Sequence, residues 1–384
     1  MEKIKVMCVF GTRPEAIKMA PVVMELSKRN EIEPIVVLTG QHREMLDQVM
    51  SLFKLSSDND LNIMQSKQTL TDITVNVLSK IEPVLIEKKP DILLVQGDTT
   101  TAFIASLAAF YNKIPVGHIE AGLRTDNKYD PFPEEMNRRL ASVIADLHFA
   151  PTAEARQNLL NCGISDEKIY LTGNTVVDAL YYILKYDNIK LPDEFVKRHK
   201  TANRIIFTET HRRENLGEPM EDICKALKKL ASDFEDIEIV FSVHKNPLVR
   251  DVVYKYLKNT ERVILLEPVD YPVMIKLMEE SFFVLTDSGG LQEEAPSLGK
   301  PVLVLRKNTE RPEGIRAGTA RLVGTNTENV YNQASLLLKD KNEYELMAKA
   351  GNPYGDGLAS ERIVDLILAS KGKKDKSSIQ FFKG

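Results

Sequence analysis

Short apolar runs rich in β-branched residues alternate with longer amphipathic segments along nearly the whole chain. Each run is apolar with little interruption, which is typical of a strand buried on both faces, and most are followed by a segment with helical spacing. Strands joined by helices in this order form parallel sheets. The pattern therefore predicts an α/β protein with two doubly wound, Rossmann-like domains.

The expected strands are Ile4–Phe10, Pro34–Leu38, Ile92–Val95, Pro115–Ile119, Leu147–Ala150 and Ile169–Leu171 in the first half, and Ile205–Thr208, Ile237–Val243, Val263–Leu266, Phe282–Thr286 and Pro301–Leu305 in the second. The helices expected in the first half are Glu15–Arg29, Arg43–Phe53, Leu70–Glu87, Thr99–Tyr111 and Glu134–Ala145. The charged segment Lys185–Arg204 shows no strong period, and we expect it to be the passage between the halves. We place the domains at residues 1–172 and 173–358.

The amino-acid composition excludes several classes of protein. Lys plus Arg number 51 and Asp plus Glu number 55, a net charge of −4, which argues against a general nucleic-acid binder. The three cysteines, Cys8, Cys162 and Cys224, are too far apart for a disulfide framework or a zinc ribbon. The longest apolar run, Ala102–Tyr111, spans about ten residues, too few to cross a bilayer, and the charged start does not read as a signal peptide. We expect a cytoplasmic protein without a membrane partner.

In such sheets, ligands bind beyond the carboxyl ends of the strands. After the first strand, Gly11 permits a tight turn and Arg13 stands at the start of a helix. Arg13 and Lys18 are candidates for contact with a phosphate there, because the free N–H groups of a helix start favour an anion. The alternative is an ordinary helix cap with solvated charges.

Three carboxylates follow strand ends or open helices in the first half. They are Asp98, Glu120 and Glu134, and an acid at the end of a buried strand is costly unless it is paired or used. Each has a structural alternative. In these alternatives Asp98 caps the next helix, Glu120 forms a salt bridge with Arg124 or a similar cation, and Glu134 pairs with Arg138 one turn further along.

The second half has its own polar segments after strands. His211 and His244 follow the first two strands, and Tyr271 follows the third. Ser288-Gly289-Gly290 after the fourth exposes consecutive N–H groups and a hydroxyl, an arrangement suited to a diphosphate, although a plain turn is the alternative. Glu294, about one turn further along, can accept hydrogen bonds from ribose hydroxyls.

The chain lacks several familiar signatures. The six histidines have no metal-ligand spacing, and neither a dinucleotide fingerprint, a P-loop nor a Gly-x-Ser-x-Gly elbow occurs. We therefore expect no metal and no cofactor. The polar segments together indicate a nucleotide-diphosphate ligand in an interdomain cleft, with acid–base chemistry on its sugar.

Six motifs in order also carry a family resemblance: Gly11-Thr12-Arg13-Pro14-Glu15, Gly97-Asp98-Thr99, Glu120-Ala121-Gly122-Leu123-Arg124-Thr125, Pro133-Glu134-Glu135-Met136-Asn137-Arg138, His211-Arg212-Arg213-Glu214-Asn215 and Asp287-Ser288-Gly289-Gly290-Leu291-Gln292-Glu293-Glu294. From about residue 4 to about residue 370, the chain resembles the non-hydrolysing UDP-N-acetylglucosamine (UDP-GlcNAc) 2-epimerases. The resemblance implies the two-domain GT-B architecture. It also implies a C-terminal helix near Ala359–Ser370 that returns to the first domain, so that residues 359–384 belong with it.

The resemblance assigns roles to the candidate residues. It implies that Asp98, Glu120 and Glu134 are the catalytic acids and that His211 stabilises the leaving group. Substrate contacts are implied or expected for Arg13, Lys18, Arg138, His244, Tyr271, Ser288, Gly289, Gly290 and Glu294, with UDP held mainly by the second domain.

The implied reaction is a reversible inversion at C2. UDP leaves C1 by anti elimination, 2-acetamidoglucal remains, and syn re-addition gives UDP-N-acetylmannosamine (UDP-ManNAc). Such a product would serve a cell-envelope polysaccharide.

The resemblance further implies a homodimer and a second, activating UDP-GlcNAc site near Gln41, His42, Arg43, Arg212 and Glu214. Where several bacterial relatives have glutamine and arginine, this chain has Glu44 and Lys67. Lysine does not reproduce the bidentate contact of arginine.

Other functions stay open. A hydrolysing relative that releases UDP and N-acetylmannosamine would begin with the same elimination. A GT-B glycosyltransferase has no need of three clustered carboxylates, and a non-catalytic nucleotide-sugar binder would not require Asp98, Glu120, Glu134 and His211.

Overall fold

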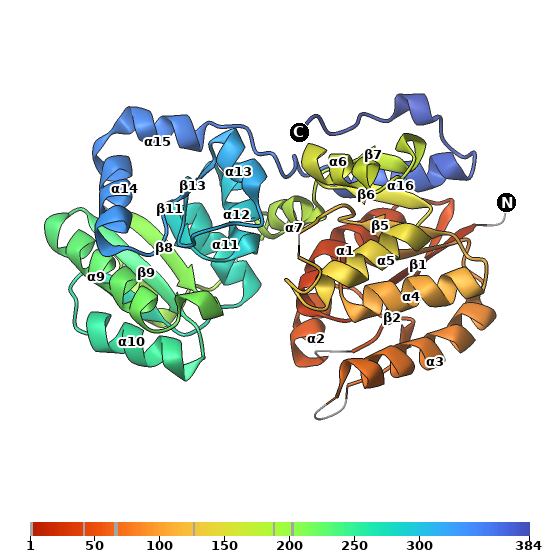
Figure 1. The fold of residues 1–384 in the computed structure, drawn as a ribbon, viewed down its shortest axis with the longest axis horizontal. Coiled ribbons are helices and arrows are strands. Elements are labelled where there is room, and N and C mark those ends of the chain that lie inside the picture. Colours follow the sequence, from red (N-terminus) through yellow and green to blue (C-terminus); the bar gives the residue numbers. More distant parts are fainter. Residues whose placement is uncertain (1–2, 41–42, 65–67, 126, 187–188, 201–202) are drawn as a thin grey trace. The chain divides into compact units, whose positions relative to one another are not determined.

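The computed structural model describes residues 3–40, 43–64, 68–125, 127–186, 189–200 and 203–384 (Figure 1). The chain divides into two compact units. Unit 1 comprises Met1–Ala179 and Tyr354–Gly384, and unit 2 comprises Leu180–Pro353. The division falls within helix α7 (Thr175–Ile183).

Unit 1 contains a seven-stranded sheet in the order β3-β2-β1-β4-β5-β6-β7, with every neighbouring pair parallel. Its strands are β1 (Ile4–Phe10), β2 (Ile32–Leu38), β3 (Asn59–Asp60), β4 (Ile92–Gln96), β5 (Val116–Ile119), β6 (Leu147–Ala150) and β7 (Ile169–Leu171). The order reverses between β1 and β4, so the loops after these two strands diverge to opposite sides and leave room for a ligand.

Helices cover both faces of this sheet. They are α1 (Arg13–Ser27), α2 (Arg43–Leu52), α3 (Leu70–Lys88), α4 (Thr100–Tyr111), α5 (Glu134–Ile144), α6 (Ala153–Asn161) and α16 (Ala359–Ser370). Figure 1 shows α3, α4 and α5 side by side, and α1 packs against α2 and α16. Met7 and Val9 join the core beneath α3 and α4, and the residues between them point to the opposite face because side chains alternate along a strand.

Unit 2 repeats the design with six parallel strands in the order β10-β9-β8-β11-β12-β13. They are β8 (Arg204–Thr210), β9 (Ile237–Val243), β10 (Val263–Leu266), β11 (Ser281–Thr286), β12 (Val302–Val304) and β13 (Ala320–Leu322). The helices are α8 (Asp193–Arg198), α9 (Glu218–Asp233), α10 (Pro247–Leu257), α11 (Tyr271–Glu280), α12 (Gly289–Glu294), α13 (Pro312–Ala317), α14 (Thr327–Lys339) and α15 (Lys341–Ala348). Here the strand order reverses between β8 and β11.

The predicted α/β class with two doubly wound parallel sheets is confirmed. The sequence pattern missed β3 and β13, which have only two and three residues and give no measurable alternation. Helix α1 begins at Arg13, two residues before its predicted start, because Thr12 and Glu15 form a capping box. The segment expected as the passage contains α8 and belongs to unit 2.

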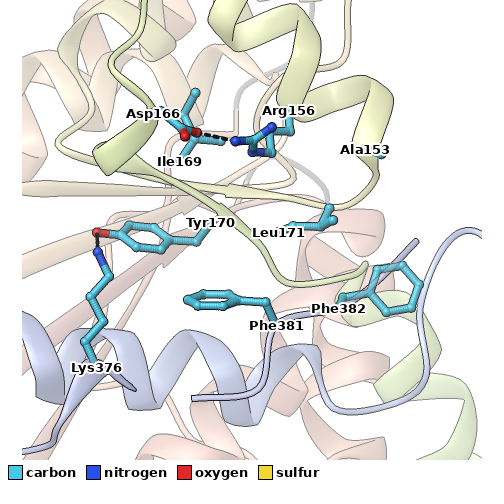
Figure 2. Close-up of a pocket in the computed structure, with 9 residues that line it drawn as sticks. All are labelled: Ala153, Arg156, Asp166, Ile169, Tyr170, Leu171, Lys376, Phe381 and Phe382. Atoms are coloured by element: carbon cyan, nitrogen blue, oxygen red, sulfur yellow. Dashed lines mark hydrogen bonds and ion pairs between the residues drawn. The ribbon is translucent and has the colours of Figure 1, made fainter. Parts of the chain in front are cut away.

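The C-terminal segment lies against β7, the edge strand of the first sheet (Figure 2). The Phe382 N–H donates to the Leu171 carbonyl at 3.1 Å, and the ring of Phe381 stacks on Tyr170 with centroids 6.2 Å apart. Lys376 donates to the Tyr170 hydroxyl at 3.2 Å. The segment thus covers backbone groups that an edge strand would otherwise expose.

Among the described residues, no helix combines the length and the apolar character that a membrane crossing requires.

Candidate functional site

The first feature is a buried carboxylate that joins the loops after β1 and β4. Glu15 Oε2 accepts hydrogen bonds from the Gly11 N–H at 3.1 Å and from the N–H and hydroxyl of Thr12, both at 2.8 Å. Glu15 Oε1 accepts from the Thr99 hydroxyl at 2.5 Å. Burial raises the pKa of Glu15 and outweighs these hydrogen bonds, which lower it. Glu15 therefore holds together the two loops that diverge at the reversal of strand order.

Glu120 stands directly after β5 in a left-handed conformation, with φ +61°. Its buried carboxylate accepts hydrogen bonds from Lys18 Nζ and Gln96 Nε2, and from Asn174 Nδ2 at 3.1 Å. The predicted alternative of a salt bridge is confirmed, but the cation is Lys18. Arg124 instead donates to the Ser142 hydroxyl at 3.0 Å. The sequence placed Lys18 at a phosphate, and the structure places its ammonium on Glu120.

Asp98 follows β4 and forms an ion pair with Arg138, whose Nη2 lies 2.6 Å from Asp98 Oδ2. The Asn137 side chain donates to the Asp98 carbonyl at 3.0 Å. Asp98 does not cap α4, because Thr99 is the N-cap residue. Arg138 therefore connects α5 to the end of β4, and within its own helix its Nη1 also lies 3.7 Å from Glu135 Oε2.

Glu134 is the half-buried first residue of α5. Its carboxylate has no hydrogen bond or ion pair with any residue in the described part of the chain, so the predicted helix pair with Arg138 is wrong. The buried acid of this helix is its neighbour Glu135, which accepts from the Thr125 N–H at 3.0 Å and from Arg139 Nε at 2.5 Å. Glu120 contacts Gln96, and Asp98 contacts Arg138. These contacts bring Asp98, Glu120 and the first turn of α5 together at the carboxyl ends of the unit 1 strands, which form one edge of the sheet.

His118 supports the same edge from within β5. Its Nε2–H donates to the Gly97 carbonyl at 2.7 Å, and Gly97 adopts φ +68°, which glycine allows without strain. Burial lowers the pKa of His118 to about 4, so its imidazole is neutral at physiological pH. It fixes the turn between β4 and Asp98.

In unit 2, the reversal of strand order is organised by Asp287, which is fully buried after β11. Its carboxylate accepts from the backbone N–H groups of His211 at 3.0 Å and Arg212 at 2.9 Å, and from Asn215 Nδ2 at 2.8 Å. Asp287 thereby folds the loop after β8 against the loop after β11.

His211 and His244 lie together beside this carboxylate. Their ring centroids are 5.7 Å apart, and His211 Nδ1 lies 3.6 Å from Asp287 Oδ1. Burial lowers the pKa of His211, opposed by the negative charge of Asp287. The Asn246 N–H donates to His244 Nδ1 at 3.1 Å, so this nitrogen accepts and the ring N–H of the neutral tautomer is on Nε2.

The turn at Ser288-Gly289-Gly290 has two guanidinium groups beside it. A Cβ atom at Gly289 would lie 3.8 Å from Arg212 Nη2 and 3.9 Å from Arg311 Nη2. Two guanidinium groups next to the N–H groups that open α12 favour an anion. Arg311 is oriented by an ion pair with the buried Glu293. Sequence reasoning missed Arg311, although it lies in a charged segment that follows a buried strand.

Glu294 and Tyr271 form one buried pair. The Tyr271 hydroxyl donates to Glu294 Oε1 at 2.8 Å, and burial raises the pKa of Tyr271 well above its usual value. A Cβ atom at Gly290 would lie 3.9 Å from Glu294 Oε2. Tyr271 thus orients the carboxylate that faces the glycine turn.

The residues predicted for an effector site are only partly described. Gln41, His42 and Lys67 lie outside the described residues, and Arg43 and Glu44 begin α2. Glu214 accepts a hydrogen bond from Arg306 Nε at 2.6 Å, whereas Arg212 lies beside Gly289. Arg13, the first residue of α1, is exposed.

Within the described ranges, no three His, Cys, Asp or Glu side chains are grouped so that they could hold a metal ion.

Comparison with known proteins covers nearly the whole chain. The family model for UDP-N-acetylglucosamine 2-epimerase matches residues 24–368. The UDP-N-acetylglucosamine 2-epimerase of Bacillus subtilis is 52% identical over 381 residues and covers 99% of each chain. The Neisseria meningitidis UDP-GlcNAc 2-epimerase, solved with UDP-GlcNAc bound, is 50% identical, with a TM-score of 0.85 over 95% of this chain and 100% of that one. S. aureus MnaA, solved with UDP, is 48% identical, with a TM-score of 0.88 over 99% and 100%. The similarity extends over both units.

Proposed function

The chain belongs to the UDP-N-acetylglucosamine 2-epimerase family, and on that premise we propose that it interconverts UDP-GlcNAc and UDP-ManNAc. The observation that carries the proposal is the grouping of Asp98, Glu120 and the first turn of α5, which begins with Glu134, at one edge of the unit 1 sheet. Acid–base chemistry at a carbon atom needs such groups.

We assign the nucleotide to unit 2. The turn at Ser288–Gly290, with Arg212 and Arg311 beside it, suits the diphosphate. Glu294, oriented by Tyr271, suits the ribose hydroxyls, and the uracil is assigned to the region of Tyr271. His211 and His244, which lie together near Asp287, are assigned to the phosphates with Arg13.

The C2 proton of an N-acetyl sugar has no adjacent carbonyl, so direct removal would be very slow. In the proposed route a carboxylate removes the C2 proton, and the C2–H electron pair forms a C1=C2 double bond. The C1–O bond breaks, and its electrons leave with the β-phosphate of UDP. The product is 2-acetamidoglucal, and the cations around the glycine turn stabilise the departing diphosphate.

Re-addition reverses these steps at the other face of C2. A carboxylic acid delivers a proton to C2, and a β-phosphate oxygen bonds again to C1, which gives UDP-ManNAc. Elimination is anti and re-addition is syn, so two of the three carboxylates divide the removal and the return of the proton. Glu120 forms an ion pair with Lys18, and Asp98 forms one with Arg138.

The test is the reaction of UDP-GlcNAc in D₂O with oxygen-18 in the C1–O–P bridge. We expect deuterium at C2 of UDP-ManNAc and movement of the label to non-bridging positions of the β-phosphate. Retained hydrogen at C2 together with an unmoved label would exclude elimination. Free N-acetylmannosamine as the first main product would instead show a hydrolysing enzyme.

We further propose a homodimer, a cytoplasmic location and a second UDP-GlcNAc as activator. The three free cysteines suit a reducing compartment. Sedimentation of the purified protein tests the dimer. A rise in the initial rate of UDP-ManNAc conversion on addition of UDP-GlcNAc tests the activator.

A further inference from the structure

Glu120 is held by residues from three separate parts of unit 1. Lys18 comes from α1 and Gln96 from the end of β4, while Asn174 comes from the segment between β7 and α7. Lys18 and Asn174 both donate to Oε1, and Gln96 donates to Oε2. The direction of the carboxylate therefore depends on Asn174 as well as on the charge of Lys18.

Asn174 is itself held by hydrogen bonds of its side chain and of its backbone. It is buried, and its Oδ1 accepts from the Val176 N–H at 3.1 Å in the first turn of α7. This bond orients the amide so that Nδ2 points to Glu120. The Asn174 N–H donates to the Tyr354 carbonyl at 2.7 Å. The residue thus links Glu120 to a segment 180 positions further along the chain.

The two segments that meet at Asn174 are those by which the chain leaves unit 1 and returns to it. The chain leaves unit 1 at Ala179 and returns at Tyr354. A Cβ atom at Gly173 would lie 3.3 Å from Gly355 Cα, and one at Gly355 would lie 3.4 Å from both the N and O atoms of Asn174. The backbones are therefore in direct contact, and glycine permits that approach.

We propose that Asn174 is a positioning residue for Glu120 and that it ties the direction of this carboxylate to the paired segments that connect the units. The proposal rests on the proposed function, because Glu120 must take part in the reaction. A change in the backbone at Asn174, or at Gly355 in contact with it, then changes the hydrogen bonding of Glu120 and, through it, the rate of proton transfer.

The test is a double-mutant cycle. Asn174→Ala removes a hydrogen bond to a charged group, and we expect kcat per UDP-binding site to fall about 10-fold while KM stays within about twofold. In the Glu120→Gln background the same change should alter kcat less than about twofold, because the group it positions is gone. A purely structural role would multiply both rates equally. Titration calorimetry with UDP counts the competent sites, so a loss of folded protein does not enter the comparison.

Two further variants complete the design. Asn174→Asp keeps the shape and the Oδ1 acceptor but lacks the Nδ2 donor, and it serves if the alanine variant does not fold; it should also lose about 10-fold or more. Gly355→Ala should lower kcat in the native background and have less effect once Asn174 is alanine.

Asp178→Asn is the matched control. Asp178 accepts from the Ala359 and Ser360 N–H groups between the same two segments, at 3.2 and 2.7 Å, and these bonds do not involve Glu120. We expect an unchanged kcat per UDP-binding site. Equal losses from Asn174→Ala in both backgrounds, or no loss in either, would overturn the inference while the native enzyme still formed UDP-ManNAc. A native protein that forms no UDP-ManNAc would overturn the proposed function and this inference with it.

Discussion

Glu134 offers a clean test of the catalytic acids because its carboxylate has no partner within the described residues. Glu134→Gln keeps the size of the side chain and leaves no charge unpaired. We expect the free energy of unfolding to change by no more than about 0.5 kcal/mol, as for an ordinary surface position. Loss of proton transfer should lower turnover about 10²–10⁴-fold, which corresponds to about 2.7–5.5 kcal/mol of activation free energy.

Glu120→Gln is the matched comparison, since the structure predicts a second effect there. Its amide would place an NH₂ group among three donors and would remove the carboxylate that contacts the Lys18 ammonium, which is only 15% exposed. Breaking a buried ion pair costs about 3–5 kcal/mol. We reduce this to about 3 kcal/mol because the lysine is partly hydrated. The rate should fall as for Glu134→Gln, but this variant should also be less stable.

Two measurements separate the effects. Chromatographic separation of UDP-GlcNAc from UDP-ManNAc gives the turnover, and urea unfolding followed by circular dichroism gives the stability. A near-native rate for Glu134→Gln would refute its role as an acid or base. Native stability of Glu120→Gln would refute the account of its ion pair with Lys18.

Three other predictions concern pH, metal ions and the nucleotide. Burial lowers the pKa of His148 to about 3, so its imidazole stays neutral in the folded state, whereas in the unfolded chain it binds a proton below about pH 6.5. The contribution of His148 to stability is therefore complete above that pH and is lost as the pH falls. Between pH 7.5 and pH 5, urea unfolding should show the native protein losing about 2 kcal/mol more free energy of unfolding than His148→Phe. A pH-independent difference between the two would contradict this. Dialysis against a chelator should leave turnover unchanged without added NAD, and activity restored only by a divalent ion would exclude the metal-free route. Arg311→Lys should weaken UDP binding about 10-fold by calorimetry, because lysine lacks the planar fork of arginine. Arg250 forms an exposed ion pair with Glu267, so the control Arg250→Lys should leave UDP binding unchanged. Equal effects of the two substitutions would show that Arg311 is not part of the site.

The strands and the chemical character of the site were predictable from the sequence. Uninterrupted apolar runs such as Ile4–Phe10 and Ile237–Val243 identify buried parallel strands from local composition alone. The ends of these apolar runs mark the ends of the strands, so the polar residues that follow them, such as Asp98 and His211, are placed at strand ends by the sequence alone. Ordered motifs then identified the family, because six short patterns at consistent spacing are specific together even though each is weak alone.

The partners of those residues were decided only by the tertiary structure. Local spacing offered Arg124 as a partner of Glu120 and favoured Arg138 as a partner of Glu134, but the structure pairs Glu120 with Lys18 and Asp98 with Arg138. These partners are 102 and 40 positions apart in the chain, and β4 lies between β1 and β5 in the sheet, so the strand order brings them together. Asn174 and Tyr354 meet in the same way. A sequence pattern reports neighbours within a few residues, whereas the hydrogen bonds of a buried carboxylate depend on which distant segments the sheet order places beside it.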